Sequence, residues 1–220
     1  MPDRLSGNFA DAVGDIKDLA KKLAGTKRGR VMIGITGGPG AGKSRLAEAV
    51  SDACWPGLKA QVIPMDGFHM EQKKLQKLGL AGDKGAPHTF EADRFIEFVA
   101  RLRTAKRAMP GPAYSREIED VVPDAYVVSG KERLLIVEGN YLLLNKEPWR
   151  VLRDLFDLTI FVSLSRRVAR DRLMKRHAEH GLFSEAHIRR HVEEVDMENF
   201  DLVAKSATRA DIILDISDAA

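Results

Sequence analysis

The stretch Gly37–Ser44, with the sequence Gly-Gly-Pro-Gly-Ala-Gly-Lys-Ser, constrains this 220-residue chain more than any other. A backbone wraps closely around a polyphosphate only where glycines remove the Cβ atoms, and four of these eight residues are glycines. The apolar run Val31–Ile35 precedes the stretch, and residues 45–50 can continue it as a helix. A strand, this loop and a helix in that order are typical of a P-loop, which binds the phosphates of a nucleotide.

The P-loop residues are expected to bind ATP and its metal ion. Main-chain N–H groups converge on the β-phosphate, and the N-terminus of the following helix adds positive potential at the same place. Lys43 reaches the β- and γ-phosphates, and the Ser44 hydroxyl ligates Mg²⁺. The residues that we predict to bind nucleotide are Gly37, Gly38, Pro39, Gly40, Ala41, Gly42, Lys43 and Ser44.

Composition narrows the class of partner. The net charge of +3 suits anionic small molecules, and no basic tail or arginine–aromatic interleaving indicates binding to nucleic acid. The single cysteine, Cys54, excludes an intramolecular disulfide and is typical of a reducing compartment. No apolar stretch approaches the roughly 18 residues of a membrane span. We therefore expect a cytoplasmic protein that acts on a small molecule and binds no membrane, while homodimer formation stays open.

The order of apolar runs predicts the α/β class, with a parallel sheet of the P-loop NTPase type flanked by helices. Residues 1–29 are predicted to form an amphipathic helix, at 8–24, and a linker, and residues 30–220 the P-loop domain. The helix is expected to pack on the sheet, although binding of a partner protein remains an alternative. Residues 109–116 are expected to break regular structure, and residues 121–128 to form a small hairpin on the substrate side.

Two acidic residues follow predicted strands. Asp66 ends the run 60–65, at the edge where open α/β sheets bind ligands, so it is a candidate to accept or orient the proton of an attacking hydroxyl. Asp66-Gly67 is also a common turn sequence, and the residues alone leave both interpretations open. Glu138 ends the apolar run 134–137 and resembles a Walker B acid, which holds Mg²⁺ or its water.

A helix that begins after Ser165 is rich in arginine and is predicted to act as a lid. Arg172 and Arg176 share one face of it, and we expect these two to close over the γ-phosphate, although a solvated charged face is the alternative. Farther along, His187 and His191 have the i,i+4 spacing that can bind zinc. No third ligand is evident, and zinc is therefore not predicted.

Several of these segments together resemble one family of enzymes. They are the P-loop, Met65–His69, Tyr114-Ser115, Val137–Asn140 and the arginine-rich helix ending in Glu179-His180-Gly181. This combination resembles the uridine kinase, phosphoribulokinase and bacterial pantothenate kinase group of P-loop kinases, particularly sugar kinases associated with fructose transport. The resemblance covers roughly residues 30–216 and implies that Asp66 is the catalytic base and that Glu138 serves the metal and substrate side.

Departures from the family bear on the phosphate acceptor. Pantothenate kinases carry a histidine two residues after the tyrosine that matches Tyr114, whereas this chain has Arg116. Uridine kinases have Ser-Phe-Tyr after the aspartate, whereas Gly67-Phe68-His69 follows it here. A sugar or polyol is therefore the expected acceptor, with a pantothenate or nucleoside kinase as the alternative. The residues expected to contact the acceptor are Asp66, His88, Tyr114, Arg116 and Asn140.

A hypothesis from another class is a P-loop ATPase switch that acts on a protein partner through the N-terminal helix. Such a switch hydrolyses ATP at a rate that small hydroxyl compounds do not change, whereas a kinase turns over ATP in response to its acceptor. Asp66, expected beside the P-loop, favours the kinase, in which Asp66, Lys43, Arg172 and Arg176 are the predicted catalytic residues.

Overall fold

Strand β2 (Val31–Thr36) lies in the middle of a six-stranded sheet in the computed structural model, which describes residues 1–181 and 184–216. The strand order is β1-β8-β7-β2-β6-β3, and every neighbouring pair is parallel. The predicted parallel α/β sheet is therefore confirmed. The other strands are β1 (Asp3–Gly7), β3 (Ala60–Pro64), β6 (Leu134–Gly139), β7 (Leu158–Ser163) and β8 (Ile212–Ile216).

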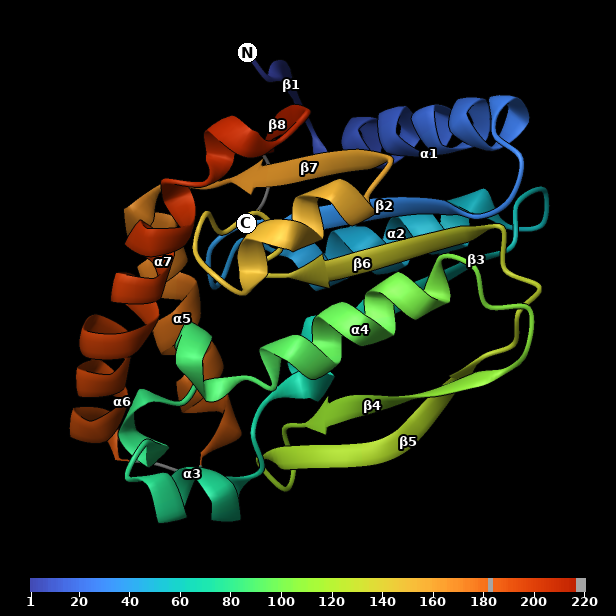
Figure 1. The fold of residues 1–220 in the computed structure, drawn as a ribbon. Helices are drawn as coiled ribbons and strands as arrows, with labels where there is room; N and C mark the ends of the chain where they lie inside the picture. The colour runs from blue at the N-terminus through green and yellow to red at the C-terminus, as the bar shows by residue number, and fades with distance from the viewer. Residues whose placement is uncertain (182–183, 217–220) are drawn as a thin grey trace.

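Seven α-helices surround this sheet in the described residues. Figure 1 shows α5, α6 and α7 gathered beyond the carboxyl ends of β6 and β7, with α4 below the sheet and α1 above it. The predicted N-terminal helix is α1, whose first turn is capped by the Asn8 side chain. The helices are α1 (Phe9–Thr26), α2 (Lys43–Cys54), α3 (Gln72–Leu78), α4 (Ala92–Leu102), α5 (Arg166–His180), α6 (Glu185–His191) and α7 (Met197–Ala204).

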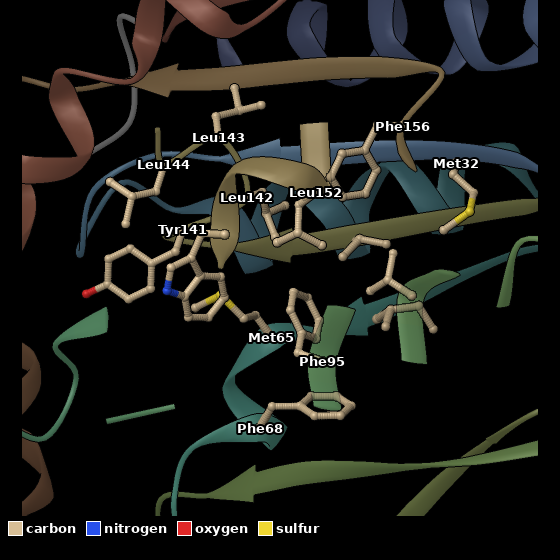
Figure 2. Close-up of a cluster of buried hydrophobic side chains, with 14 of the residues drawn as sticks. Met32, Met65, Phe68, Phe95, Tyr141, Leu142, Leu143, Leu144, Leu152 and Phe156 are labelled. Carbon is tan, nitrogen blue, oxygen red and sulfur yellow. The ribbon is translucent and has the colours of Figure 1, made fainter. Parts of the chain in front are cut away.

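The continuous apolar strands divide their side chains between two cores. In β2, Ile33 and Ile35 pack with α1 and α2, whereas Met32 points to the opposite core, which includes α4. Figure 2 shows this second core, where Phe95 of α4 lies near Phe68 and Met65 beyond the end of β3. Each of these buried side chains stabilises the fold by about 1.5–3 kcal/mol, so both layers are fixed around the strand that carries the P-loop.

The substrate-side insertion differs from the sequence prediction. Met109–Ser115 forms strand β4 rather than irregular structure, and Asp120–Val128 forms a single strand, β5, rather than both arms of a hairpin. The two strands pair antiparallel, with a register shift between Gly111 and Ala113. Prolines remove ladder hydrogen bonds, but a two-stranded ribbon has a free edge on each strand, so Pro110 and Pro112 are tolerated.

Strand β1 was not predicted, because Asp3–Gly7 offers one large apolar side chain, Leu5, and no alternating pattern. Its main chain nevertheless pairs along its whole length with β8, and Leu5 packs against the core that contains α1. The N-terminal segment thus extends the sheet by one edge strand. Among the residues that the structure describes, no helix combines the length and apolarity needed to span a bilayer.

Candidate active site

The P-loop, residues 37–44, runs from the end of β2 into the first turn of α2. Gly40 and Gly42 have φ angles of +77° and +84°, a left-handed conformation that other residues rarely adopt. A Cβ atom placed on Gly42 meets no other atom within 4 Å, so the space beside it is open. The loop therefore offers the concave, glycine-lined main chain that a phosphate group requires.

Glycine is required at positions 37 and 38 for a different reason, namely close packing. A Cβ atom on Gly37 would lie 2.7 Å from the main-chain oxygen of Val162 in β7. On Gly38 it would lie 2.4 Å from the ring of Phe200 in α7. Both glycines allow neighbouring elements to pack directly on the loop, and so they fix its position in the fold rather than provide open space for a phosphate.

Gly38→Ala is expected to lower the free energy of unfolding by about 1–3 kcal/mol, because the added methyl group overlaps Phe200. Equilibrium denaturation with urea measures the change. Gly14→Ala in the interior of α1 is the matched control: nothing lies within 4 Å of its Cβ position, so the same substitution should stabilise by about 0.5–1 kcal/mol. Equal effects of the two substitutions would contradict the packing role of Gly38.

Lys43 is held inside the site, with only 8% of its surface exposed. Its ammonium group donates a hydrogen bond to the Gly38 carbonyl at 3.1 Å, which bends the side chain back over the loop. Burial lowers the pKa of Lys43, whereas the nearby Glu138 and Asp66 carboxylates raise it. A buried cation beside open main-chain donors is suited to binding a polyphosphate.

Sheet register brings the two predicted acids to the same place. Pro64 of β3 pairs with Glu138 of β6, so Asp66, two residues beyond Pro64, lies beyond the edge where Glu138 stands. Each acid is followed by a glycine that permits close packing. A Cβ on Gly139 would lie 2.5 Å from Met65, and a Cβ on Gly67 would lie 2.1 Å from the main-chain oxygen of Pro112. Asp66-Gly67 can therefore be both a tight turn and part of the site, the two interpretations that the sequence left open.

Glu138 has a buried carboxyl group whose pKa is raised, mainly by burial and then by the neighbouring charge of Asp66. Lys43 and a hydrogen bond with the Ser44 side chain act in the opposite direction. Ser44 and Glu138 thus present a hydroxyl and a carboxylate oxygen side by side, and both are ligands that Mg²⁺ prefers. This donor set fits the predicted magnesium site, although a cation must overcome the tendency of Glu138 to bind a proton.

A cavity of about 510 Å³ joins these groups to the lid and the insertion. This volume lies in the range of pockets that bind small molecules. A second hollow of about 230 Å³ adjoins the first at the P-loop, and the two share Gly40, Lys43, Ser44 and Arg176. The site therefore has two compartments that meet at the P-loop lysine, as transfer of a group between two ligands requires.

The arginines of α5 separate as helical spacing predicts. Arg166 and Arg170 point outward to ion pairs with Asp201 and Glu193. Arg172 lines the smaller hollow and donates a hydrogen bond to the Gly40 carbonyl at 3.3 Å. Arg176 lines both compartments.

Arg176 is the lid arginine that faces the junction. Its guanidinium is largely buried, and its Nε atom has no hydrogen-bond partner among the residues that the structure describes. Burial lowers the pKa of Arg176, and the positive charge of Arg116 acts in the same direction. A buried, incompletely paired guanidinium has a strong affinity for an anion. A phosphoryl group at the junction of the two hollows would lie beside Arg176, which lines both.

The predicted acceptor residues divide into two groups. Tyr114, Arg116 and Asn140 line the larger cavity together with Asp66. The Tyr114 hydroxyl donates a hydrogen bond to Glu119 at 3.0 Å, and both burial and that carboxylate raise its pKa. His88 does not line this cavity, because its ring turns outward, is half exposed and pairs with Asp83 at 3.2 Å.

Sequence analysis missed several residues of the cavity wall. His69 and Lys84 surround Tyr114, with ring centroids of His69 and Tyr114 4.9 Å apart and the Lys84 ammonium 5.2 Å from the Tyr114 ring. His69 lies in the Met65–His69 motif, which was a usable signal. The others belong to loops and helix ends that the fold brings together, namely Lys84, Glu119, His177, His191 and Asp196.

Comparison with known proteins identifies the family of the chain. A model of the phosphoribulokinase / uridine kinase family matches residues 32–219. The chain belongs to this family. It is therefore an ATP-dependent kinase that uses Mg²⁺ and phosphorylates a hydroxyl group of a small metabolite.

Individual relatives show the range of the family. The chain is 36% identical over 194 residues to a "putative uridine kinase" of Schizosaccharomyces pombe, covering 84% of this chain and 83% of the relative. It is 31% identical to a pantothenate kinase of Lacticaseibacillus casei, of which it spans about half, 52%, while the match covers 70% of this chain. A crystal structure of a "putative fructose transport system kinase" from Silicibacter sp. TM1040 is similar, with a TM-score of 0.81, 30% identity and coverage of 92% and 98%.

Proposed function

We propose that the chain transfers the γ-phosphate of ATP to a hydroxyl group of a sugar or related polyol. The observation that carries the proposal is that Asp66 shares one cavity with Lys43, Ser44 and Glu138. A carboxylate at this position can accept the hydroxyl proton as the acceptor oxygen bonds to the γ-phosphorus. The bond from that phosphorus to the β–γ bridging oxygen breaks, and ADP leaves.

The roles of the remaining residues follow from their compartments. Lys43 and Arg176 offset the charge on the transferring group, because both side chains reach the junction of the two hollows. Ser44 and Glu138 would hold Mg²⁺, which supplies further positive charge at the phosphates when bound. Arg172 holds the P-loop through the Gly40 carbonyl and lines the smaller hollow, which we assign to the nucleotide.

The acceptor class is argued from the wall of the larger cavity. A polyol presents many hydroxyl groups that both donate and accept hydrogen bonds. A cavity that binds a polyol therefore needs both hydrogen-bond donors and acceptors in its wall. The described lining is balanced between four acidic residues, Asp66, Glu119, Glu138 and Asp196, and four basic residues, Lys43, Lys84, Arg116 and Arg176. This balance favours a neutral polyhydroxyl compound over a strongly charged acceptor.

The turn after Asp66 also distinguishes this wall from that of uridine kinases. Their motif has serine directly after the aspartate, whereas a side chain on Gly67 would overlap the main chain of Pro112. Strand β4 therefore lies closer to Gly67 than a serine at that position allows. This difference in packing next to the proposed base supports an acceptor other than a nucleoside.

Release of ADP should rise with one sugar or polyol and little with nucleosides, pantothenate or glycerate in a coupled assay across these four classes. Mass spectrometry of the product then identifies the phosphate ester. Activation by a nucleoside or by pantothenate alone would overturn the acceptor class while leaving the kinase intact. ATP hydrolysis that no acceptor changes would contradict phosphoryl transfer to a small molecule.

A further inference from the structure

A compact cluster of side chains on the lid side of the larger cavity has no task in the proposed transfer. It consists of His177 of α5, His191 at the end of α6 and Asp196 of the following turn, and we call it the lid-side cluster. The Nε2 atom of His177 lies 2.9 Å from a carboxylate oxygen of Asp196, and one ligand atom from each residue lies within 4.8 Å of the others. All three side chains line the cavity.

An irregularity in the lid helices creates this cluster. Residues Val192–Asp196 form one turn of π-helix, in which the Met197 N–H donates to the Val192 carbonyl five residues earlier. Positions five apart diverge around an α-helix, but they lie nearly above one another where the helix widens to i,i+5 bonding. The π turn therefore places Asp196 on the same side as His191, and α5 packs against both α6 and this turn, adding His177.

We propose that the lid-side cluster binds a divalent cation of the zinc type. Two imidazole nitrogens and one carboxylate oxygen are a donor set that zinc and its neighbours in the first transition row prefer. The proposed magnesium site, by contrast, consists of oxygen donors alone. Three protein ligands that face a cavity leave a coordination position for water or for an oxygen atom of the acceptor.

The geometry requires only a small adjustment. Two atoms bound to one ion at about 2.1 Å lie at most about 4.2 Å apart, so the longest separation of 4.8 Å must shorten by less than about 1 Å. Rotation of the half-buried imidazole rings can supply this movement. His187, one helical turn before His191, also lines the cavity on the same side.

The surrounding charges define what else the ion binds. Asp196 contributes one negative charge and the histidines none when neutral, so a bound divalent ion leaves one positive charge beside Arg176. A ligand oxygen with negative character relieves this excess. An acceptor oxygen, or hydroxide from a bound water, has that character, and the ion would thus orient the acceptor from the wall that carries the lid.

Titration of the chain alone with Zn²⁺, in millimolar Mg²⁺ to occupy the oxygen-rich site, tests the proposal without nucleotide or acceptor. We expect saturable uptake of about one equivalent, and Co²⁺ should give visible absorption bands at the same stoichiometry. His191→Ala and Asp196→Asn should each weaken binding by about tenfold or more. Because activity is not measured, failure here is distinct from failure of the proposed function.

His88→Ala is the matched control, since His88 is exposed on the surface and pairs only with Asp83 in the described contacts. It should leave zinc uptake unchanged. Thermal unfolding without metal shows whether each variant folds, and added Zn²⁺ should raise the Tm of the unsubstituted chain but not that of His191→Ala. No saturable uptake, or equal affinity in His191→Ala and the unsubstituted chain, would overturn the proposal.

Discussion

Asp66→Asn should lower the rate of phosphoryl transfer by about 10²–10⁴-fold while ATP still binds. The amide keeps the shape of the side chain but cannot take the hydroxyl proton. Asp66 lines the acceptor cavity and stands outside the smaller hollow, so the nucleotide contacts stay in place. Single-turnover transfer to the acceptor measures the rate, and fluorescence titration with a nucleotide analogue measures binding.

The same substitution has two opposing effects on the magnesium site. Asp66 is one of the charges that raise the pKa of Glu138, so removing it favours the ionised form of Glu138, but it also removes a carboxylate that attracts the cation. The affinity for Mg²⁺, measured by titration, should therefore change little. Asp93→Asn on the exposed side of α4 is the matched control and should transfer phosphate normally. Full activity of Asp66→Asn would refute its role as base.

Much of the fold could be predicted because its strands are short apolar runs. β2 and β6 are buried on both faces, which requires continuous apolarity, and that pattern is visible without any partner. β1 escaped prediction because an edge strand needs only main-chain pairing and one inward side chain, Leu5. β4 escaped because its prolines are breakers in most contexts, and only the two-stranded pairing with β5 makes them acceptable.

Some residues of the candidate site could likewise be predicted from the sequence, and others could not. Asp66 and Glu138 were predictable since each stands at or just after the carboxyl end of a strand, where the edge of a parallel sheet collects such residues, and Lys43 was predictable from the P-loop motif. Asp196 was not, because nothing in the sequence marks a π turn. His88 was predicted to contact the acceptor, but the turn that carries it points its ring to Asp83.

Helical geometry alone predicted which arginines of α5 share a face, but it did not predict that Arg172 and Arg176 make different contacts. Arg172 and Arg176 lie one turn apart on the same face. Only the packing shows that Arg172 already donates to Gly40, whereas Arg176 is buried with its Nε atom unpaired in the described structure. The proposed roles of the two arginines therefore depend on which turn of α5 meets the junction of the two hollows.

Arg176→Ala should lower kcat by about 10³-fold, the lower end of the range for arginines that stabilise a transferring phosphoryl group. Arg176→Lys should recover little, because an ammonium group lacks the planar, two-pronged donor geometry of guanidinium. ATP affinity should change by less than about tenfold, since Lys43 and the loop main chain remain. Steady-state kinetics with saturating ATP and acceptor separates these effects.

Arg167→Ala is the control on the same helix, because the Arg167 side chain is 83% exposed and, within the described part of the chain, its ion pair is the i,i+4 pair with Asp171. It should keep normal kcat. The Tm of Arg176→Ala should not fall although its kcat does. Removal of a buried, incompletely paired charge should leave the Tm unchanged or raise it. A loss of activity with a large fall in Tm would instead mean that Arg176 holds the lid together. Intact folding together with lost transfer would distinguish a guanidinium that binds the phosphoryl group through its incompletely paired donors from one that serves the structure.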